Sequence, residues 1–347
     1  MSSVFLITGI CGHLGSTIAH LLIEQGETVR GFALPNDDRS MLEPEIELVR
    51  GNVREKASIE PLFEGFHESD DLIVIHTAGL ITISGHQEEL LFSVNVDGTR
   101  NVIELCQQHR VKRLVYVSST HAILIKSVGE IVSEASQFSP DKLESLYSKT
   151  KAMATQMVLD AERNGLNAVV VHPSGLIGPG DHGSGLSTQL VANYLNGLIT
   201  ACIRGGYDFV DVRDVARGVI AAARFGRRGE CYLLTNRFFT ALELLDMLHE
   251  LTGQKKIKTL VPHWLLHLTM PFAALYFQVR KQKPLFTADS LAILTENARF
   301  SHEKADRELA YATRPMRDTL RDTITFLQLA GRLKVRSAKQ VSESHNQ

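Results

Sequence analysis

The stretch LITGICGHLGSTIAHLL, from Leu6 to Leu22, decides the fold, because three glycines in it join a short apolar strand to a helical pattern. These glycines are Gly9, Gly12 and Gly15. A helix N-terminus favours an anion such as a pyrophosphate, and glycines let the backbone approach it closely. The spacing is GxxGxxG rather than GxGxxG, and a tight strand-to-helix turn is the alternative explanation. Because the motif opens the first strand–helix–strand unit, we favour a dinucleotide site.

The rest of the N-terminal half alternates short apolar strands with longer helical patterns. The expected strands are Val4–Thr8, Thr28–Ala33, Glu47–Arg50, Asp71–His76, Lys112–Val117 and Asn167–His172, and the expected helices are Leu14–Gln25, Glu88–His109 and Leu143–Asn164. This alternation predicts an α/β fold of the Rossmann type, in which a doubly wound parallel sheet has helices on both faces.

The pattern loosens after Pro173. The segment HPSGLIGPGDHGSG, residues 172–185, is dense in glycine and proline and is expected to be a loop. Val212–Phe225 is expected to be a helix and Cys231–Thr235 a strand, and both return to the first domain. We therefore assign residues 1–172 and about 208–235 to a dinucleotide-binding Rossmann domain, residues 173–207 and 236–330 to a smaller, mostly helical C-terminal substrate lobe, and residues 333–347 to a disordered tail.

Composition excludes several classes of protein. The chain has 347 residues, 44% of them hydrophobic, with a formal net charge of −2, whereas nucleic-acid-binding domains show a clear basic excess. The four cysteines form no CxxC pair, so neither a disulfide framework nor a thiolate zinc site is indicated, and we expect a reducing cytoplasmic location. The N-terminus does not resemble a signal peptide, and no apolar run is long enough to span a bilayer.

A second stretch, LESLYSKTKAMA from Leu143 to Ala154, places Tyr147 before two lysines. A helix turns by about 100° per residue, so Lys151 shares the face of Tyr147 while Lys149 points to nearly the opposite side. An ammonium beside a phenol lowers the phenol pKa, which would let Tyr147 exchange a proton with a substrate oxygen. A solvated helix with chance neighbours is the alternative.

The segment VYVSST, from Val115 to Thr120, ends the fifth expected strand with three hydroxyl groups. The carboxyl ends of parallel strands form the ligand crevice, so a hydroxyl there can hold a substrate oxygen beside the phenol. A serine-rich turn is the alternative. The order of the glycine loop, the hydroxyl strand end and the YxxxK helix favours the catalytic interpretation.

With further motifs, this order resembles the extended short-chain dehydrogenase/reductases, the epimerase/dehydratase-like group, over about residues 3–325. The motifs are TGICGHLG (8–15), GNV (51–53), HTAG (76–79), NVDGTRNV (95–102), VYVSST (115–120), YSKTK (147–151), HPSGLIGPGD (172–181) and FVDVRDVA (209–216). The resemblance implies that Tyr147 is the catalytic acid/base and that Lys151 grips the nicotinamide ribose. It assigns the hydroxyl partner to Thr120, with Ser119 as the second choice.

The resemblance also implies a set of cofactor contacts. They are Gly9, Cys11, Gly12, His13, Leu14, Gly15, Asn52, Val53, Thr77, Ala78, Gly79, Asn95, Ser118, Tyr147, Lys151 and Pro173. The choice between NAD and NADP stays open. The second strand ends in Ala33 and Leu34, where an acid for the ribose or an arginine for a 2′-phosphate is common. Asp37, Asp38 and Arg39 follow and are within reach in either sense.

Three positions depart from the family pattern. Asn52 stands where the family often has aspartate, while Gly175 and Tyr207 stand where members that bind nucleotide sugars usually carry asparagine and often arginine. We therefore expect an NAD(P)-dependent oxidoreductase that interconverts a hydroxyl and a carbonyl on a small apolar substrate. The alternatives are a nucleotide-sugar epimerase or dehydratase that retains NAD, and a non-catalytic dinucleotide-binding protein.

The C-terminal part supplies the substrate side. The segment ARFSHEKADRELAYATRP (298–315) resembles the closing segment of the branch similar to 3β-hydroxysteroid dehydrogenases and dihydroflavonol reductases. The aromatic, apolar segment 261–280 is either a substrate wall or the core of the lobe.

The last expectations concern the roles of the histidines and the oligomeric state. His263 and His267 are four residues apart but lack a third ligand, so no metal site is expected. His13, His121 and His182 are expected to be loop or packing residues. The resemblance implies a homodimer through the helices Glu88–His109 and Leu143–Asn164.

Overall fold

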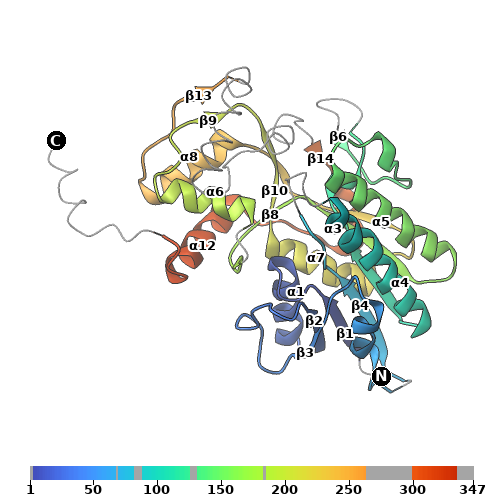
Figure 1. Cartoon of the computed structure of the whole chain (residues 1–347). Coiled ribbons are helices and arrows are strands. Elements are labelled where there is room, and N and C mark those ends of the chain that lie inside the picture. Colours follow the sequence, from blue (N-terminus) through green and yellow to red (C-terminus); the bar gives the residue numbers. More distant parts are fainter. Residues whose placement is uncertain are drawn as a thin grey trace, which may run out of the picture.

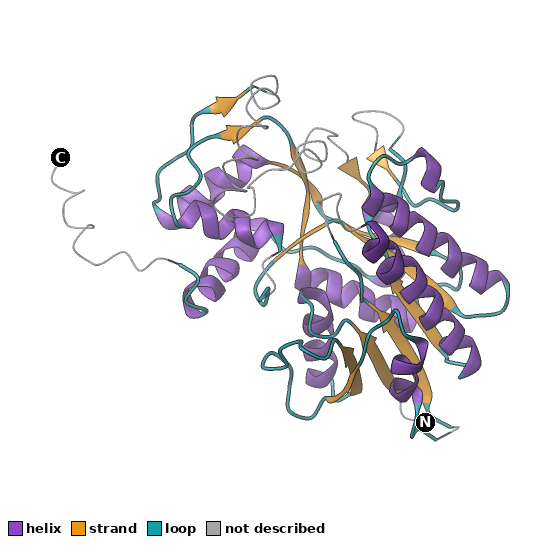
Figure 2. Cartoon of the chain, viewed as in Figure 1, coloured by secondary structure: helices purple, strands orange, loops and turns teal. Residues whose placement is uncertain are grey.

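A seven-stranded parallel sheet forms the centre of the protein in the computed structural model, which describes residues 3–67, 69–81, 88–125, 131–182, 185–262 and 299–333. The strand order is β11-β7-β5-β4-β1-β2-β3, and every neighbouring pair is parallel. Figure 2 draws the strands in orange with purple helices around them. The strands are β1 (Ser3–Thr8), β2 (Thr28–Ala33), β3 (Glu47–Arg50), β4 (Asp71–His76), β5 (Arg113–Val117), β7 (Ala168–Pro173) and β11 (Cys231–Leu234). The order reverses between β1 and β4, so the predicted Rossmann-type sheet is confirmed.

Helices cover both faces of this sheet (Figure 1). The helices α1 (His13–Glu24) and α7 (Val212–Phe225) lie on one face, and α4 (Gly98–Gln108) and α5 (Leu146–Arg163) on the other. Successive side chains of a strand point to opposite faces. Phe5 and Ile7 therefore join the core under α1 and α7, while Val4 and Leu6 join the core under α4 and α5.

Two of the expected helices differ in detail. The expected helix Glu88–His109 is divided into α3 (Glu88–Phe92), a π-helical turn η2 (Ser93–Asp97) and α4. The helix expected from Leu143 starts at Leu146, because the Ser145 side chain caps it by accepting a hydrogen bond of 3.0 Å from the Ser148 N–H. Ser145 is a residue type strongly preferred at this position.

Short helical elements connect the larger ones. They are α2 (Lys56–Ile59), η1 (Glu60–Phe63), η3 (Thr120–Ala122) and η4 (Pro140–Lys142).

The C-terminal region contains small sheets as well as the expected helices (Figure 1). Its strands β8 (Gly175–Ile177), β10 (Gly206–Asp211) and β12 (Arg237–Thr240) form one sheet, and β9 (Cys202–Ile203) pairs with β13 (Leu260–Val261). Its strand β14 (Arg299–Phe300) pairs with β6 (Ile131–Val132), which lies earlier in the chain. Its helices are α6 (Leu186–Leu195), α8 (Ala241–Thr252), α11 (Glu303–Leu309) and α12 (Met316–Leu329). The apolar faces of α6, α8 and α12 share one core.

The expectation of a loop over residues 172–185 is wrong at β8. This strand pairs in parallel with β10, and Gly175 lies opposite Phe209. A Cβ atom at Gly175 would stand 3.0 Å from the rings of both Tyr207 and Phe209. The glycine that suggested a loop therefore allows close packing inside a small sheet.

The structure also bears on the expected division of the chain into two domains. The strand β11 extends the first sheet by pairing with β7, and the helix α7 packs on α1 against one face of that sheet. The domain boundaries themselves stay a prediction. Residues 263–298 lie outside the described residues, and with them most of the segment 261–280, expected to be either a substrate wall or the core of the lobe, including His263 and His267. Of the expected tail 333–347, residues 334–347 also lie outside the described residues.

A buried chain of polar groups ties the ends of β1 and β4 to the π-helical turn. The Thr8 hydroxyl lies 2.6 Å from His76 Nδ1, and His76 Nε2 lies 3.1 Å from the Thr99 hydroxyl. That hydroxyl donates to the Asn95 carbonyl at 2.7 Å. Burial lowers the pKa of His76 to about 3, and the nearby Lys151 charge adds to the effect. The ring is therefore neutral and serves as a fixed link.

Acid should destabilise this fold through its buried histidines. Burial lowers the pKa of His76 to about 3 and the pKa of His121 and His172 to about 4. An unfolded histidine titrates near 6.5, so the unfolded chain takes up protons first. Stability is complete above about pH 6.5 and falls toward pH 4, by about 1 kcal/mol per buried histidine at about pH 5.5.

Urea unfolding at about pH 7.5 and 5.5 measures this loss. The variant His76→Gln should lose less stability between the two pH values than the wild type, and exposed His67→Gln is the matched control. Equal unfolding free energies of the wild type at both pH values would contradict the account.

Candidate active site

The glycine turn between β1 and α1 is packed backbone against backbone. Gly9 has φ +69°, and a Cβ there would stand 2.8 Å from the Ala78 N and Cα atoms. A Cβ at Gly15 would stand 2.4 Å from the Gly9 carbonyl oxygen. Gly12 caps α1 without a side-chain hydrogen bond. The first-turn N–H groups of α1 therefore meet no capping side chain, which suits a pyrophosphate, and these residues fit a dinucleotide.

The predicted cofactor residues gather at one edge, because parallel strands have their carboxyl ends on the same side. Cys11, His13 and Leu14 follow β1, Asn52 and Val53 follow β3, Thr77, Ala78 and Gly79 follow β4, Ser118 follows β5 and Pro173 ends β7. Some of their polar groups serve the protein itself. The Ser118 hydroxyl pairs with that of Thr155 at 2.6 Å. Burial lowers the pKa of His13, whose Nε2 lies 2.9 Å from the Pro179 carbonyl.

Asn95 occupies the π-helical turn and holds the segment after β4. Its side chain accepts from the Leu80 N–H at 2.8 Å and donates to the Leu80 carbonyl at 3.0 Å. It also donates to the Thr150 hydroxyl at 3.1 Å. A Cβ at Gly79 would lie 3.4 Å from the Asn95 Oδ1 atom. Single π turns often occur at functional sites, and this one fixes the chain beside α5.

Lys151 is buried beside the end of β5. Its Nζ donates to the Val117 carbonyl at 2.9 Å and to the Tyr116 hydroxyl at 3.4 Å, and lies 5.0 Å from the centre of the Tyr116 ring. Burial lowers the pKa of Lys151 to about 7. Sequence analysis missed Tyr116, although the strand VYVSST contains it.

Tyr147 faces Ser119, but its phenol is not made more acidic. Burial raises the pKa of Tyr147 to about 12, and a hydrogen bond with Ser119 opposes the rise. The lowered pKa expected from a neighbouring ammonium is therefore wrong for this arrangement. The reason is geometric, since the Lys151 ammonium donates to Val117 and Tyr116.

The two candidate hydroxyls after β5 point to different partners. Burial raises the pKa of Tyr147 and a hydrogen bond with Ser119 lowers it, whereas the Thr120 hydroxyl lies 3.0 Å from the hydroxyl of Tyr207 on β10. Because Tyr207 engages Thr120, Ser119, the second choice from the sequence, is the better candidate for the hydroxyl beside the phenol.

His121 and Tyr207 form a wall next to Tyr147. Their rings are stacked with centres 5.4 Å apart, and the Tyr207 hydroxyl lies 2.9 Å from His121 Nε2. The His121 ring meets the Tyr147 ring edge-on at 5.9 Å. Burial lowers the pKa of His121 to about 4, so the ring is neutral. The sequence did not indicate this pairing, because Tyr207 lies 86 residues away on a strand of another sheet.

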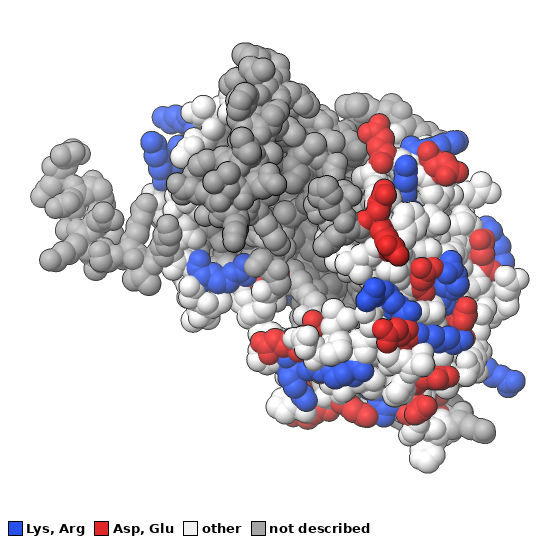
Figure 3. Space-filling model, viewed as in Figure 1, with Lys and Arg blue, Asp and Glu red and all other residues white. Residues whose placement is uncertain are grey.

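Other features of the described residues do not compete with this site. They contain no group of three or more His, Cys, Asp or Glu side chains arranged to hold a metal ion. Among their helices, none has both the length and the apolar character needed to cross a membrane. On the face drawn in Figure 3, acidic and basic side chains are interspersed over the part that carries the large sheet.

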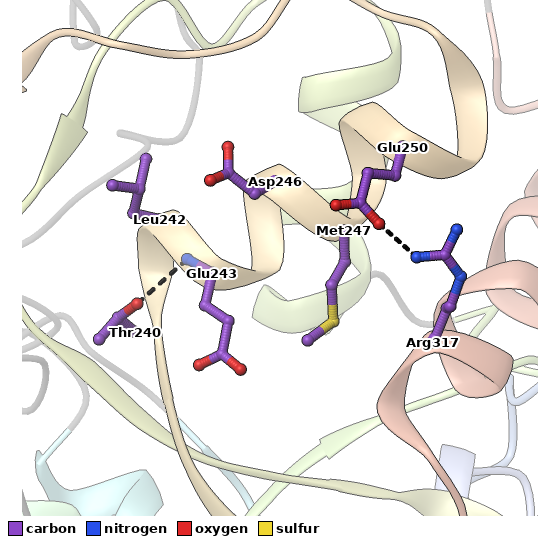
Figure 4. A pocket seen from close by; sticks show the side chains of 7 residues that line it. All are labelled: Thr240, Leu242, Glu243, Asp246, Met247, Glu250 and Arg317. Atoms are coloured by element: carbon purple, nitrogen blue, oxygen red, sulfur yellow. Dashed lines mark hydrogen bonds and ion pairs between the residues drawn. The ribbon is translucent and has the colours of Figure 1, made fainter.

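A separate hollow lies beside α8 and α12 (Figure 4). It is lined by Thr240, Leu242, Glu243, Asp246, Met247, Glu250 and Arg317. Glu250 forms an ion pair with Arg317 across it. None of the residues discussed above lines this hollow, so we do not assign the reaction to it.

The fold and the site define a class, that of dinucleotide-binding α/β proteins with a tyrosine and a lysine at the crevice of the sheet. The chain belongs to the NAD dependent epimerase/dehydratase family, whose model matches residues 5–234, and this confirms the resemblance to extended short-chain dehydrogenase/reductases. It is an NAD(P)-dependent oxidoreductase of that type.

Similarity to individual proteins is consistent with this family assignment. The chain is 30% identical over 331 residues to sterol demethylase protein B of Methylococcus capsulatus, covering 94% of this chain and 98% of that protein. It is 28% identical over 342 residues to a dihydroflavonol 4-reductase-like protein of Synechocystis, covering 96% and 97%. The crystal structure of gox2253 superposes with a TM-score of 0.82 at 29% identity, covering 95% of this chain and 99% of that one.

The position of Lys151 gives a paired test with Lys149. Lys151→Met should weaken cofactor binding and lower kcat by about a hundredfold or more, because it removes the ammonium held at the crevice end of β5. Lys149→Met, two residues away on another face of α5, should change both by less than about twofold. Steady-state kinetics and cofactor titration measure the effects. Equal losses in the two variants would refute the assignment.

The two hydroxyls give a second paired test. Ser119→Ala should lower kcat by about a hundredfold, because it removes the hydroxyl beside Tyr147. Thr120→Val keeps the shape of the side chain and should change kcat by only a few fold, since that hydroxyl serves Tyr207. A larger loss in Thr120→Val than in Ser119→Ala would return the role to Thr120.

Proposed function

We propose that the protein interconverts a secondary hydroxyl and a carbonyl on an apolar, multi-ring substrate, with Tyr147 as the acid/base. One observation carries this proposal. Tyr147, Ser119 and Lys151 meet at the carboxyl end of β5, on the same edge of the sheet as the glycine turn. A proton donor, a hydroxyl and a cation at that crevice are what carbonyl chemistry requires.

The chain holds the cofactor along this edge in our proposal. The N–H groups of the first turn of α1 bind the pyrophosphate, and Lys151 binds the nicotinamide ribose. The bound nicotinamide cofactor supplies or accepts the hydride. Val117 and Tyr116 fix the Lys151 ammonium, so the lysine enters the complex already oriented.

Tyr147 moves the proton at the substrate oxygen. Burial keeps its phenol protonated at neutral pH, with a pKa of about 12, so in the reductive direction the phenol donates to the carbonyl oxygen. The oxidative direction requires the phenolate, so the phenol must first lose this proton before it can accept one from the alcohol. Ser119 shares the substrate oxygen with Tyr147 and keeps it within hydrogen-bonding distance of the phenol.

The walls beside Tyr147 support an uncharged substrate. His121 is neutral and stacks on Tyr207, and Tyr207 stands where nucleotide-sugar enzymes often carry arginine. Gly175, where they usually carry asparagine, packs on the Tyr207 ring. These contacts speak against a nucleotide-sugar epimerase. The names of two relatives, a sterol demethylase protein and a dihydroflavonol reductase-like protein, refer to multi-ring alcohols or ketones.

We also propose a homodimer through α4 and α5 and a cytoplasmic location. The homodimer rests on the family resemblance, and the location rests on the scattered free cysteines.

The function is tested with purified protein and a panel of substrates. NAD(P)H formation should accompany oxidation of a 3β-hydroxysteroid, or NAD(P)H consumption reduction of a dihydroflavonol, while UDP-glucose should give no turnover. Tyr147→Phe should lower kcat by about a hundredfold to ten-thousandfold and leave cofactor binding nearly unchanged, because it removes only the transferred proton. Undiminished turnover in this variant, or turnover of UDP-glucose alone, would contradict the proposal.

A further inference from the structure

The His172 side chain connects β5 and β7 beyond the end of their backbone hydrogen bonds. The Ser118 N–H donates to the Val171 carbonyl at 2.8 Å, but Pro173 has no N–H with which to extend this ladder. The Nδ1 atom of His172 lies 2.9 Å from the Ser119 carbonyl oxygen. Because a carbonyl only accepts hydrogen bonds, Nδ1 carries the proton and donates it to this bond.

This bond ties the turn that carries Ser119 to the large sheet. Ser119 has an extended backbone and precedes η3, and its side chain accepts from the His121 N–H at 3.2 Å. Its carbonyl also accepts from the Ala122 N–H at 3.1 Å. These two bonds lie within the turn and move with it. The bond from His172 comes from a residue 53 positions away on another strand, so it fixes the turn relative to the sheet.

The His172 ring is buried and serves as a hydrogen-bond donor rather than as an acid or base. Its exposed fraction is 0%, and it stacks on Phe138 with ring centres 5.4 Å apart. Burial lowers the pKa of His172 to about 4, so the ring is neutral at pH 7. Its Nε2 atom is buried and has no hydrogen-bond partner among the described residues. An unpaired buried nitrogen costs stability, and an apolar side chain would avoid that cost. What the histidine adds is the Nδ1 donor.

We propose that His172 is a positioning residue for the reaction, because its Nδ1–H holds the Ser119 carbonyl and thereby keeps the Ser119 hydroxyl directed at Tyr147. This inference rests on the proposed function, in which Ser119 and Tyr147 share the substrate oxygen. A displacement of about 1 Å at a reacting group can cost about a hundredfold in rate. One bond from the sheet to the backbone of Ser119 therefore affects kcat although His172 touches neither substrate nor cofactor.

Substitutions at His172 separate the donor from the bulk of the ring. His172→Leu fills a similar volume without a donor and should lower kcat by at least about tenfold. His172→Asn places an amide N–H near the position of Nδ1 and should keep kcat within about threefold of the wild type. It also leaves a cavity beside Phe138, so it should be no more stable than His172→Leu. His172→Gln carries its amide one carbon further, should resemble His172→Leu in kcat, and replaces it if His172→Leu does not fold.

His109 provides a matched control. Its ring also stacks on a phenylalanine, Phe63, with centres 5.0 Å apart, and its Nε2 atom likewise has no hydrogen-bond partner within the part of the chain that the structure describes. It follows α4 just before β5 begins, so it lies at the edge of the sheet opposite the crevice. His109→Leu should leave kcat within about twofold. Steady-state kinetics with saturating NAD(P), on a 3β-hydroxysteroid or a dihydroflavonol, and melting temperatures compare all variants.

A double-mutant cycle tests whether His172 acts through Ser119. Added to Ser119→Ala, His172→Leu should lower kcat by less than about threefold further, whereas added to Thr120→Val it should cost its full factor. Multiplied losses in the Ser119→Ala background, equal losses in His172→Asn and His172→Leu, or undiminished kcat in His172→Leu would overturn the inference and leave the proposed oxidoreductase standing. Undiminished kcat in Ser119→Ala would instead refute the role of Ser119 in the proposed function, and a wild type that turns over neither substrate would refute that function itself.

Discussion

The contact of the Gly9 backbone with Ala78 is the constraint on which the rest of the structure depends. It brings the end of β1 against the segment after β4 with no room for a side chain, at the point where the strand order reverses. Gly15 likewise leaves no room for a side chain, because the first turn of α1 packs directly on the Gly9 carbonyl. Because these contacts join backbone to backbone, they fix where a helix N-terminus faces the crevice.

Buried hydrogen bonds, in addition to apolar packing, connect this turn to the helix α5. Thr8, His76 and Thr99 link the ends of β1 and β4 to the π-helical turn. Asn95 continues the link from that turn to α5, which carries the proposed acid/base. Each link is buried and paired, so displacement of any member would leave a polar group unsatisfied at considerable cost. The reacting groups are thereby oriented before substrate arrives, which is the condition for efficient catalysis.

Local patterns predicted the features that depend on local physics. Strand alternation and apolar runs located the strands of the large sheet, and helical periodicity separated Lys151 from Lys149. The features that were missed depend on contacts distant in sequence. The strand at Gly175 forms only because β10 lies beside it. Ser119 and Thr120 are told apart only by distant partners, since Tyr207 on β10 engages the Thr120 hydroxyl.

The central claim is that one edge of the sheet binds a nicotinamide dinucleotide with its reactive end at Tyr147. A crystal structure of the protein with NAD tests this claim most directly. The account predicts the pyrophosphate at the N-terminus of α1, the nicotinamide ribose on Lys151 and the nicotinamide ring between Pro173 and the Tyr147 hydroxyl. A dinucleotide bound elsewhere, or bound here with its nicotinamide turned away from Tyr147, would contradict it.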